Sequence, residues 1–183
     1  MGKIKTINIF GSSGSGSTTL ARAVAKKYGY IFIDTDDAIW EKTELPFSKR
    51  KSDKDAREYL EARMKTGDKI VISGSFIGWA DDIKEKIDLF VYLNLPLEIR
   101  KSRIESREKA RFGNRVLPGG DLYQKHIDFL EWISLYDETP ESLRGKKQHE
   151  MWLADVKVPV VRITEPADID TLVDAVEKRL NLS

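Results

Sequence analysis

The sequence predicts an α/β fold in which a parallel β-sheet is covered by helices on both faces. Short apolar segments rich in β-branched residues alternate with segments whose apolar residues recur every three or four positions. Such alternation is typical of βαβ units, whose strands are buried on both sides. The chain has 183 residues, of which 40% are hydrophobic and 33% charged, and this size and composition predict a single domain over residues 1–183.

Five strands are expected, each a short apolar run that stops at a turn or a polar residue. They cover residues 4–10, 30–33, 70–73, 89–93 and 158–163. Helices are expected after the first turn up to Gly29, at 53–65, at 97–107, through 122–136 and at 169–180, and residues 110–120 are expected to form a loop. In a parallel sheet ligands bind where the strands end, so the segments 11–19, 34–37, 73–79, 94–96 and 164–167 should surround one site.

Composition excludes several classes of function. The net charge is +1, which gives no global field for binding nucleic acid, and no apolar run approaches the roughly 18 residues of a membrane span. The absence of cysteine excludes disulfides, thiolate metal sites and thiol nucleophiles. We therefore expect a soluble cytoplasmic protein with no nucleic-acid or membrane partner.

The first strand leads into a glycine-rich loop of the form G-x-x-x-x-G-x-T, directly before a helix. Glycines allow successive backbone N–H groups to point inward, and the helix N-terminus adds positive potential, so the loop suits a polyphosphate. The hydroxyl of Thr18 is placed to bind a Mg²⁺ ion bridging the phosphates. A nucleoside triphosphate with Mg²⁺ is the expected ligand, and the expected nucleotide-binding residues here are Gly11, Ser12, Ser13, Gly14, Ser15, Gly16, Ser17, Thr18 and Thr19.

One position departs from the usual phosphate-binding loop. Ser17 stands where a lysine normally supplies a full positive charge to the transferred phosphoryl group. A serine hydroxyl offers only a neutral hydrogen bond, so another cation must compensate if the protein is a competent enzyme.

Asp34, Asp36 and Asp37 follow the second strand. Phosphoryl transfer to a hydroxyl needs one carboxylate to orient that hydroxyl and accept its proton, and a second is useful for holding Mg²⁺. In an extended segment Asp34 and Asp36 project to the same side, whereas Asp37 points away or begins a helix.

The order strand, glycine-rich loop, helix, strand and Asp34-Thr35-Asp36 resembles the shikimate-kinase-like branch of the P-loop kinases, relatives of adenylate, cytidylate and gluconate kinases. Together with Ser73-Gly74-Ser75 and Arg111-Phe112-Gly113-Asn114-Arg115, it is most similar to bacterial proteins described as adenylate-kinase-related or AAA-family ATP-binding. The resemblance implies a three-layer P-loop NTPase fold with strand order 2-3-1-4-5. It also implies that Asp34 lies on the Mg²⁺ side and that Asp36 meets the acceptor hydroxyl.

Arginines are concentrated before and within the predicted loop. Residues 96–115 hold seven basic and three acidic side chains. Kinases close a mobile, arginine-bearing lid over the phosphates, and guanidinium groups match phosphate oxygens. We expect a lid at about 107–121 in which Arg111 and Arg115 act on the γ-phosphate, while Arg107 and the segment with Thr164 and Pro166 contact the nucleotide.

The sequence specifies the phosphoryl acceptor less well than it specifies the nucleotide. The acceptor-binding region is expected at about 34–66 and at the end of the third strand, with Asp36, Trp40, Arg57, Gly74, Ser75 and Trp79 as candidate substrate-binding residues. Flat aromatic side chains suit a ring-shaped ligand. Similarity to shikimate kinases puts Trp132 near the position of their substrate arginine, which argues against shikimate. His126 is expected at the surface.

Three functions remain open at this stage. The first is a kinase that transfers the γ-phosphoryl group of ATP to a hydroxyl of a small molecule. The second is a nucleoside or nucleoside-monophosphate kinase, and the third is a nucleotide-binding regulator that lost catalysis with its lysine. The third strand ends without an aspartate, which disfavours a motor ATPase. The protein is expected to be a monomer or a weak homodimer.

Overall fold

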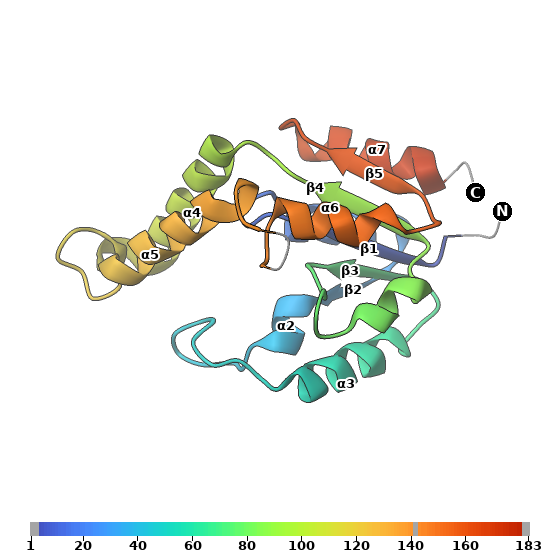
Figure 1. Ribbon diagram of the computed structural model, residues 1–183, viewed down its shortest axis with the longest axis horizontal. Coiled ribbons are helices and arrows are strands. Elements are labelled where there is room, and N and C mark those ends of the chain that lie inside the picture. The colour runs from blue at the N-terminus through green and yellow to red at the C-terminus, as the bar shows by residue number, and fades with distance from the viewer. Residues whose placement is uncertain (1–3, 141–142, 181–183) are drawn as a thin grey trace.

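The computed structural model describes residues 4–140 and 143–180, which are built around a five-stranded parallel sheet in the order β2-β3-β1-β4-β5 (Figure 1). The strands are β1 (Thr6–Gly11), β2 (Ile31–Asp34), β3 (Ile70–Ser73), β4 (Leu89–Leu93) and β5 (Val160–Ile163). The predicted α/β class and strand order are confirmed. Each strand lies within one or two residues of its expected position; the inner strands are buried, whereas the edge strands β2 and β5 are partly exposed.

The described chain contains both the predicted helices and segments that the sequence did not indicate. The α-helices are α1 (Ser17–Tyr28), α2 (Thr35–Ile39), α3 (Asp53–Met64), α4 (Leu97–Phe112), α5 (Tyr123–Ser134), α6 (Lys146–Ala154) and α7 (Ile169–Leu180), and the 3₁₀ segments are η1 (Asp81–Lys86), η2 (Gly113–Val116) and η3 (Leu135–Asp137). The prediction of a loop at 110–120 was partly wrong, because α4 continues to Phe112 and η2 follows it. Helices α2 and α6 were not predicted.

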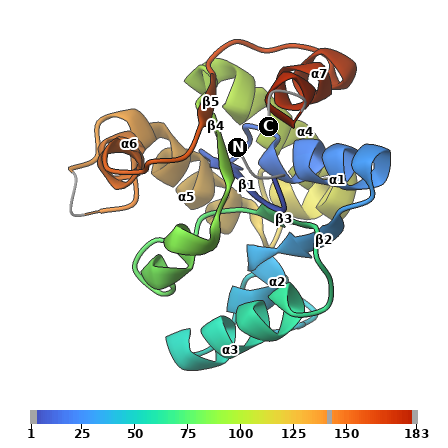
Figure 2. The same ribbon diagram turned by 90° about the vertical axis from the view of Figure 1, so that its right-hand side faces the viewer.

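Helices cover both faces of the sheet (Figure 2), and an apolar core lies on each face. Alternation along β1 sends Ile7 and Ile9 toward α1 and α7, where Leu20 and Val176 are buried. Phe10 belongs to the opposite core, which α3, η1 and α6 cover. The helices thus cover both faces of the sheet and leave the carboxyl-terminal edge, where the strands end, uncovered.

Helices α4 and α5 project from this edge as a packed pair (Figure 1), and the buried Arg100 fixes their base. The Arg100 guanidinium donates to the carbonyl oxygens of Leu95 (2.8 Å) and Ile133 (3.2 Å) and to the Asp137 carboxylate (2.6 Å). A fully buried cation is tolerated here because its hydrogen bonds are made and one partner is charged. Arg100 therefore connects β4, α4 and the end of α5.

Replacing Arg100 with alanine should destabilise the protein by about 3 kcal/mol, because two carbonyl oxygens and a carboxylate lose their donor. Urea denaturation followed by circular dichroism measures this change. The exposed Lys109 on the same helix provides a control, since Lys109→Ala should change the free energy of unfolding by less than about 0.5 kcal/mol. Equal stability of the two variants would contradict this role of Arg100.

Candidate active site

The phosphate loop between β1 and α1 requires its glycines. Gly14 and Gly16 have φ values of 81° and 95°, a region that other residues rarely adopt. A Cβ on Gly11 would lie 1.9 Å from the carbonyl oxygen of Leu93, and one on Gly14 would lie 2.6 Å from that of Arg100. The loop is consequently pressed against the end of β4 and the first turn of α4.

Several polar groups of this loop are free to meet a ligand. No side chain caps the N-terminus of α1, whose first N–H groups therefore lack that partner. The hydroxyl of Ser12, a residue of the cleft lining, has no hydrogen-bond partner among the described residues. The Thr18 hydroxyl lies 2.9 Å from that of Ser73, at the end of β3. An anion with several oxygens fits this arrangement of donors.

The carboxylates after β2 are arranged differently from the extended segment that we expected. Asp34 caps the short helix α2, since its Oδ1 accepts a hydrogen bond from the backbone N–H of Asp36 at 3.1 Å. The carboxylates of Asp34 and Asp36 still line the same cleft as the phosphate loop, whereas Asp37 is not part of the cleft lining. Helix α2 is held against β3 at Gly74, where a Cβ would lie 2.0 Å from the Thr35 hydroxyl oxygen.

The electrostatic environment raises the pKa of both carboxyl groups. Loss of water raises the pKa of Asp34 to about 6, and the hydrogen bond from Asp36 N–H opposes this shift. Asp36 opens onto the cleft, but the surrounding protein displaces enough water to raise its pKa, with partial compensation by Arg144 and Arg107. A carboxylate whose pKa is raised is a better proton acceptor near neutral pH.

The cleft has a volume of about 950 Å³, at the upper end of the range for small-molecule sites. Its walls come from the phosphate loop, the segment 34–48, the end of β3, α4, α5 and Arg144. Of the residues predicted from sequence, it brings together Gly11, Ser12, Ser13, Gly14, Gly16, Ser17, Thr18, Thr19, Asp34, Asp36, Trp40, Gly74, Ser75, Arg107 and Arg111.

Other predicted site residues lie elsewhere. Arg57 pairs with Glu61 and Asp82, and its guanidinium is not part of the cleft wall. Trp79 packs against the core beneath α6, because the chain turns away after Gly78. Ser15 lies beneath the loop surface, and Thr164 and Pro166 are exposed after β5 outside the cleft lining.

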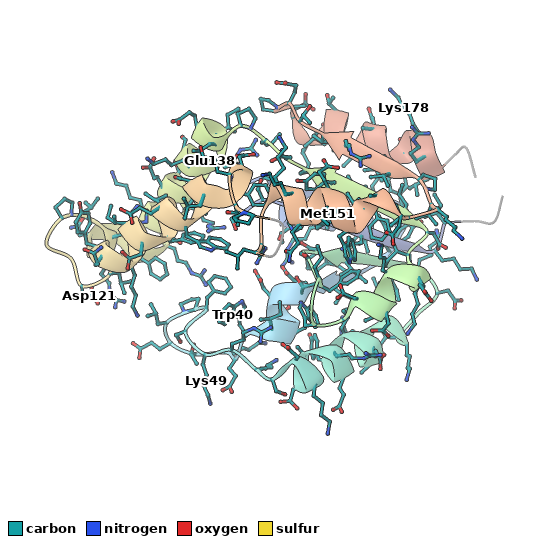
Figure 3. The ribbon with its side chains drawn as sticks, in the orientation of Figure 1. Trp40, Lys49, Asp121, Glu138, Met151 and Lys178 are labelled. Carbon is teal, nitrogen blue, oxygen red and sulfur yellow. The ribbon has the colours of Figure 1, made fainter. Side chains whose placement is uncertain are left out.

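Arg115 is also separated from the cleft, because it forms a two-pronged ion pair with Asp121. Its Nε and Nη2 lie 2.9 and 2.6 Å from the two carboxylate oxygens. Figure 3 shows Asp121 at the outer tip of the α4–α5 pair, whereas Trp40 lies in the region between that pair and α2. The arginines of α4 that line the cleft are Arg103, Arg107 and Arg111, which recur at every fourth position along one flank of the helix.

Sequence reasoning missed several residues of the cleft. Phe47 packs edge-on against Trp40 (6.0 Å between ring centroids) and lies under the Arg111 guanidinium (6.0 Å). Arg144 lies over the Trp132 ring at 5.7 Å. His126 was expected at the surface, but it is buried in the cleft wall and its Nδ1 lies 3.2 Å from Glu108. Spacing along α4 is the signal that could have identified Arg103.

The donor set fits a nucleoside triphosphate with Mg²⁺. The uncapped α1 N-terminus and the glycine loop provide N–H donors for phosphates, while Thr18 and Asp34 provide oxygen ligands. Within residues 4–140 and 143–180, no group of three or more histidine, aspartate or glutamate side chains could hold a metal ion unaided. A Mg²⁺ ion at this site would depend on phosphate oxygens, as is usual for this ion.

The fold and this loop define a P-loop kinase that acts on a small molecule, and comparisons with known proteins agree. The family model described as shikimate kinase matches residues 13–150. The chain is 38% identical over 172 residues to the uncharacterised protein YqaC of Bacillus subtilis strain 168, which covers 94% of this chain and 95% of YqaC. The protein therefore belongs to the shikimate kinase family.

Two further likenesses extend this result. A cytidylate kinase of Methanocorpusculum labreanum is 34% identical over 152 residues, covering 75% of this chain and 84% of that protein. The crystal structure of shikimate kinase from Acinetobacter baumannii in complex with shikimate superposes with a TM-score of 0.57 at 16% identity, covering 97% of this chain and 93% of that one, which shows the common fold. In the described part of the chain, no helix is long and apolar enough to cross a membrane.

The raised pKa of Asp34 predicts a pH-dependent cost in the free energy of folding of the metal-free protein. Because folding favours the protonated carboxyl, the cost is absent below about pH 4 and is complete above the folded pKa of about 6. Asp34→Asn keeps the cap of α2 and removes the charge, so it should stabilise the protein by about 2 kcal/mol at pH 8 and not at pH 4. Urea denaturation in the presence of a chelator tests this, and an equal effect at both pH values would refute it.

Proposed function

We propose that the protein transfers the γ-phosphoryl group of Mg²⁺-ATP to a hydroxyl group of a small molecule, with Asp36 as the proton acceptor. The observation that carries the proposal is the position of Asp36 in the same cleft as the phosphate loop. Its raised pKa suits proton transfer near neutral pH. Family membership supports the use of ATP.

The step is an in-line displacement. The Asp36 carboxylate hydrogen-bonds the acceptor hydroxyl, fixes its direction and takes its proton as the oxygen attacks the γ-phosphorus. A new bond forms between the acceptor oxygen and phosphorus while the bond to the β–γ bridging oxygen breaks, so ADP leaves with that oxygen. Asp36 then releases its proton to solvent.

The negative charge on the transferred phosphoryl group would be balanced by arginines on one flank of α4. Arg107 and Arg111 line the cleft, and the contact between Arg111 and Phe47 connects the lid to the acceptor segment. Closing of these elements would exclude water and favour transfer over hydrolysis. Arg115 has no part in this proposal, because its guanidinium is already paired with Asp121.

Thr18 and Asp34 are the residues that would hold Mg²⁺, directly or through water. The ion, when bound, neutralises charge on the β- and γ-phosphates during transfer. The contact of Thr18 with Ser73 keeps the Thr18 hydroxyl directed toward the cleft side of β3.

A nucleoside-monophosphate acceptor is the second candidate, and the aromatic walls favour it. Trp40 and Phe47 line the cleft on the acceptor side, and the stacked pair Phe129 and Trp132 lines it from α5. A nucleobase suits such flat surfaces, and Arg144 over Trp132 could hold a phosphate. The cytidylate kinase relative supports the same substrate class. A nucleoside-monophosphate acceptor would attack the γ-phosphorus through a phosphate oxygen instead of a hydroxyl oxygen, and ADP would leave as before.

Asp36→Asn should lower acceptor-dependent ADP release by about 10²- to 10⁴-fold, because the amide cannot accept the proton. Affinity for ATP, measured by calorimetry, should stay within about threefold, since the role assigned to Asp36 is toward the acceptor. The acceptor panel would contain sugars, polyols, nucleosides and nucleoside monophosphates.

Asp37→Asn is the matched control, because Asp37 is the next residue of α2 and does not line the cleft. It should retain wild-type turnover. An Asp36→Asn enzyme that works at full rate would refute the proposed role of Asp36. ATP binding without turnover on any acceptor would instead favour a nucleotide-binding regulator.

A further inference from the structure

The phosphate loop contains no lysine, yet the fold places a positively charged side chain of α4 against it. Ser17 begins α1 at the position where a lysine would supply charge. Polyphosphates carry several negative charges, and a loop of neutral donors compensates them only in part. A cation fixed next to the loop would complete the site.

Arg103 of α4 is in direct contact with the loop. Its Nη1 donates a hydrogen bond of 3.0 Å to the backbone oxygen of Ser15. The same nitrogen lies 3.5 Å from the position that a Cβ on Gly16 would occupy. The guanidinium therefore covers the turn that immediately precedes α1, where the phosphate-binding N–H groups begin.

The backbone of α4 is held firmly enough to keep Arg103 there. The first turn of α4 touches the loop at Gly14, and the buried Arg100, one turn before Arg103, is hydrogen-bonded to Leu95 and Ile133. Because both contacts fix the start of the helix, Arg103 reaches the loop without a movement of the lid. A group that is already in place costs little ordering entropy when a ligand binds.

The charge of Arg103 is available to a ligand. Within residues 4–140 and 143–180, no carboxylate forms an ion pair with it, in contrast to Arg57 and Arg115. One guanidinium N–H is used by Ser15, a guanidinium carries further donors, and Arg103 lines the cleft. Arg107 and Arg111 lie about one and two turns further along α4 and approach the acceptor side, where Arg111 meets Phe47.

We propose that Arg103 supplies the positive charge that the loop lysine provides in related sites, and that it does so by binding the phosphates of the nucleotide from α4. This inference rests on the proposed function only in requiring that a nucleotide binds at the loop. It goes beyond that function because it identifies a phosphate-binding residue outside the glycine-rich motif.

Calorimetry with Mg²⁺-ADP and with tripolyphosphate tests the proposal, since neither measurement requires transfer. Arg103→Gln should weaken the binding of both ligands by about 10- to 100-fold, because a charge-assisted contact is lost. Lys109→Gln removes the same charge from an exposed position of α4 and should leave both affinities within about twofold of wild type.

A lysine introduced into the loop gives the sharper test. In the Arg103→Gln background, Ser17→Lys should restore the affinity for Mg²⁺-ADP to within about threefold of wild type, because the lost charge returns at the same phosphates. Failure of this rescue in a folded double variant would overturn the proposal. If the double variant does not fold, the binding of tripolyphosphate to Arg103→Gln decides the question. Unchanged binding would overturn the proposal, because it would show that Arg103 acts on the base or on the fold and not on the phosphates.

The outcomes also separate this inference from the proposed function. Wild-type protein that binds Mg²⁺-ADP through Arg103 but phosphorylates no acceptor would support the inference and contradict the kinase proposal. If Arg103→Gln shows normal turnover and unchanged affinity for Mg²⁺-ADP, the kinase proposal is supported and this inference is contradicted. Wild-type protein that binds neither Mg²⁺-ADP nor tripolyphosphate would overturn both.

Discussion

The close approach of the phosphate loop to β4 and α4 is the constraint on which the site depends. Gly11 and Gly14 allow the loop to lie against the carbonyl oxygens of Leu93 and Arg100, at distances that no side chain would permit. This contact fixes the first turn of α4, and the hydrogen bonds of Arg100 fix the same turn from the other side. The phosphate loop and the first turn of α4 are therefore fixed relative to each other.

Two positions that carry a charged residue in many P-loop proteins carry hydroxyl groups in this chain. Ser17 replaces the lysine, and Ser73 stands at the end of β3, where a Mg²⁺-binding aspartate is common in motor ATPases. Ser73 is instead hydrogen-bonded to Thr18. The charged side chains of the cleft come from α4, α5 and Arg144 and from Asp34 and Asp36, whereas the phosphate loop contributes none.

The sequence predicted the sheet well because buried parallel strands leave an unambiguous apolar pattern. It did not predict α2, whose five residues are too few for a helical period, or α6, which lies in a polar segment. It placed Asp36 and Arg111 in the cleft, but it could not distinguish Arg103 from Arg115. These residues have the same side chain, and the difference arises from tertiary contacts with Ser15 and Asp121.

The central claim is that this cleft transfers a phosphoryl group to an organic acceptor. The most direct measurement is the ³¹P NMR spectrum of the protein incubated with Mg²⁺-ATP and a mixture of sugars, polyols, nucleosides and nucleoside monophosphates. The account predicts ADP together with a new phosphate monoester, or a new diphosphate if the acceptor is a nucleoside monophosphate. Unchanged ATP, or ADP accompanied only by inorganic phosphate, would contradict it.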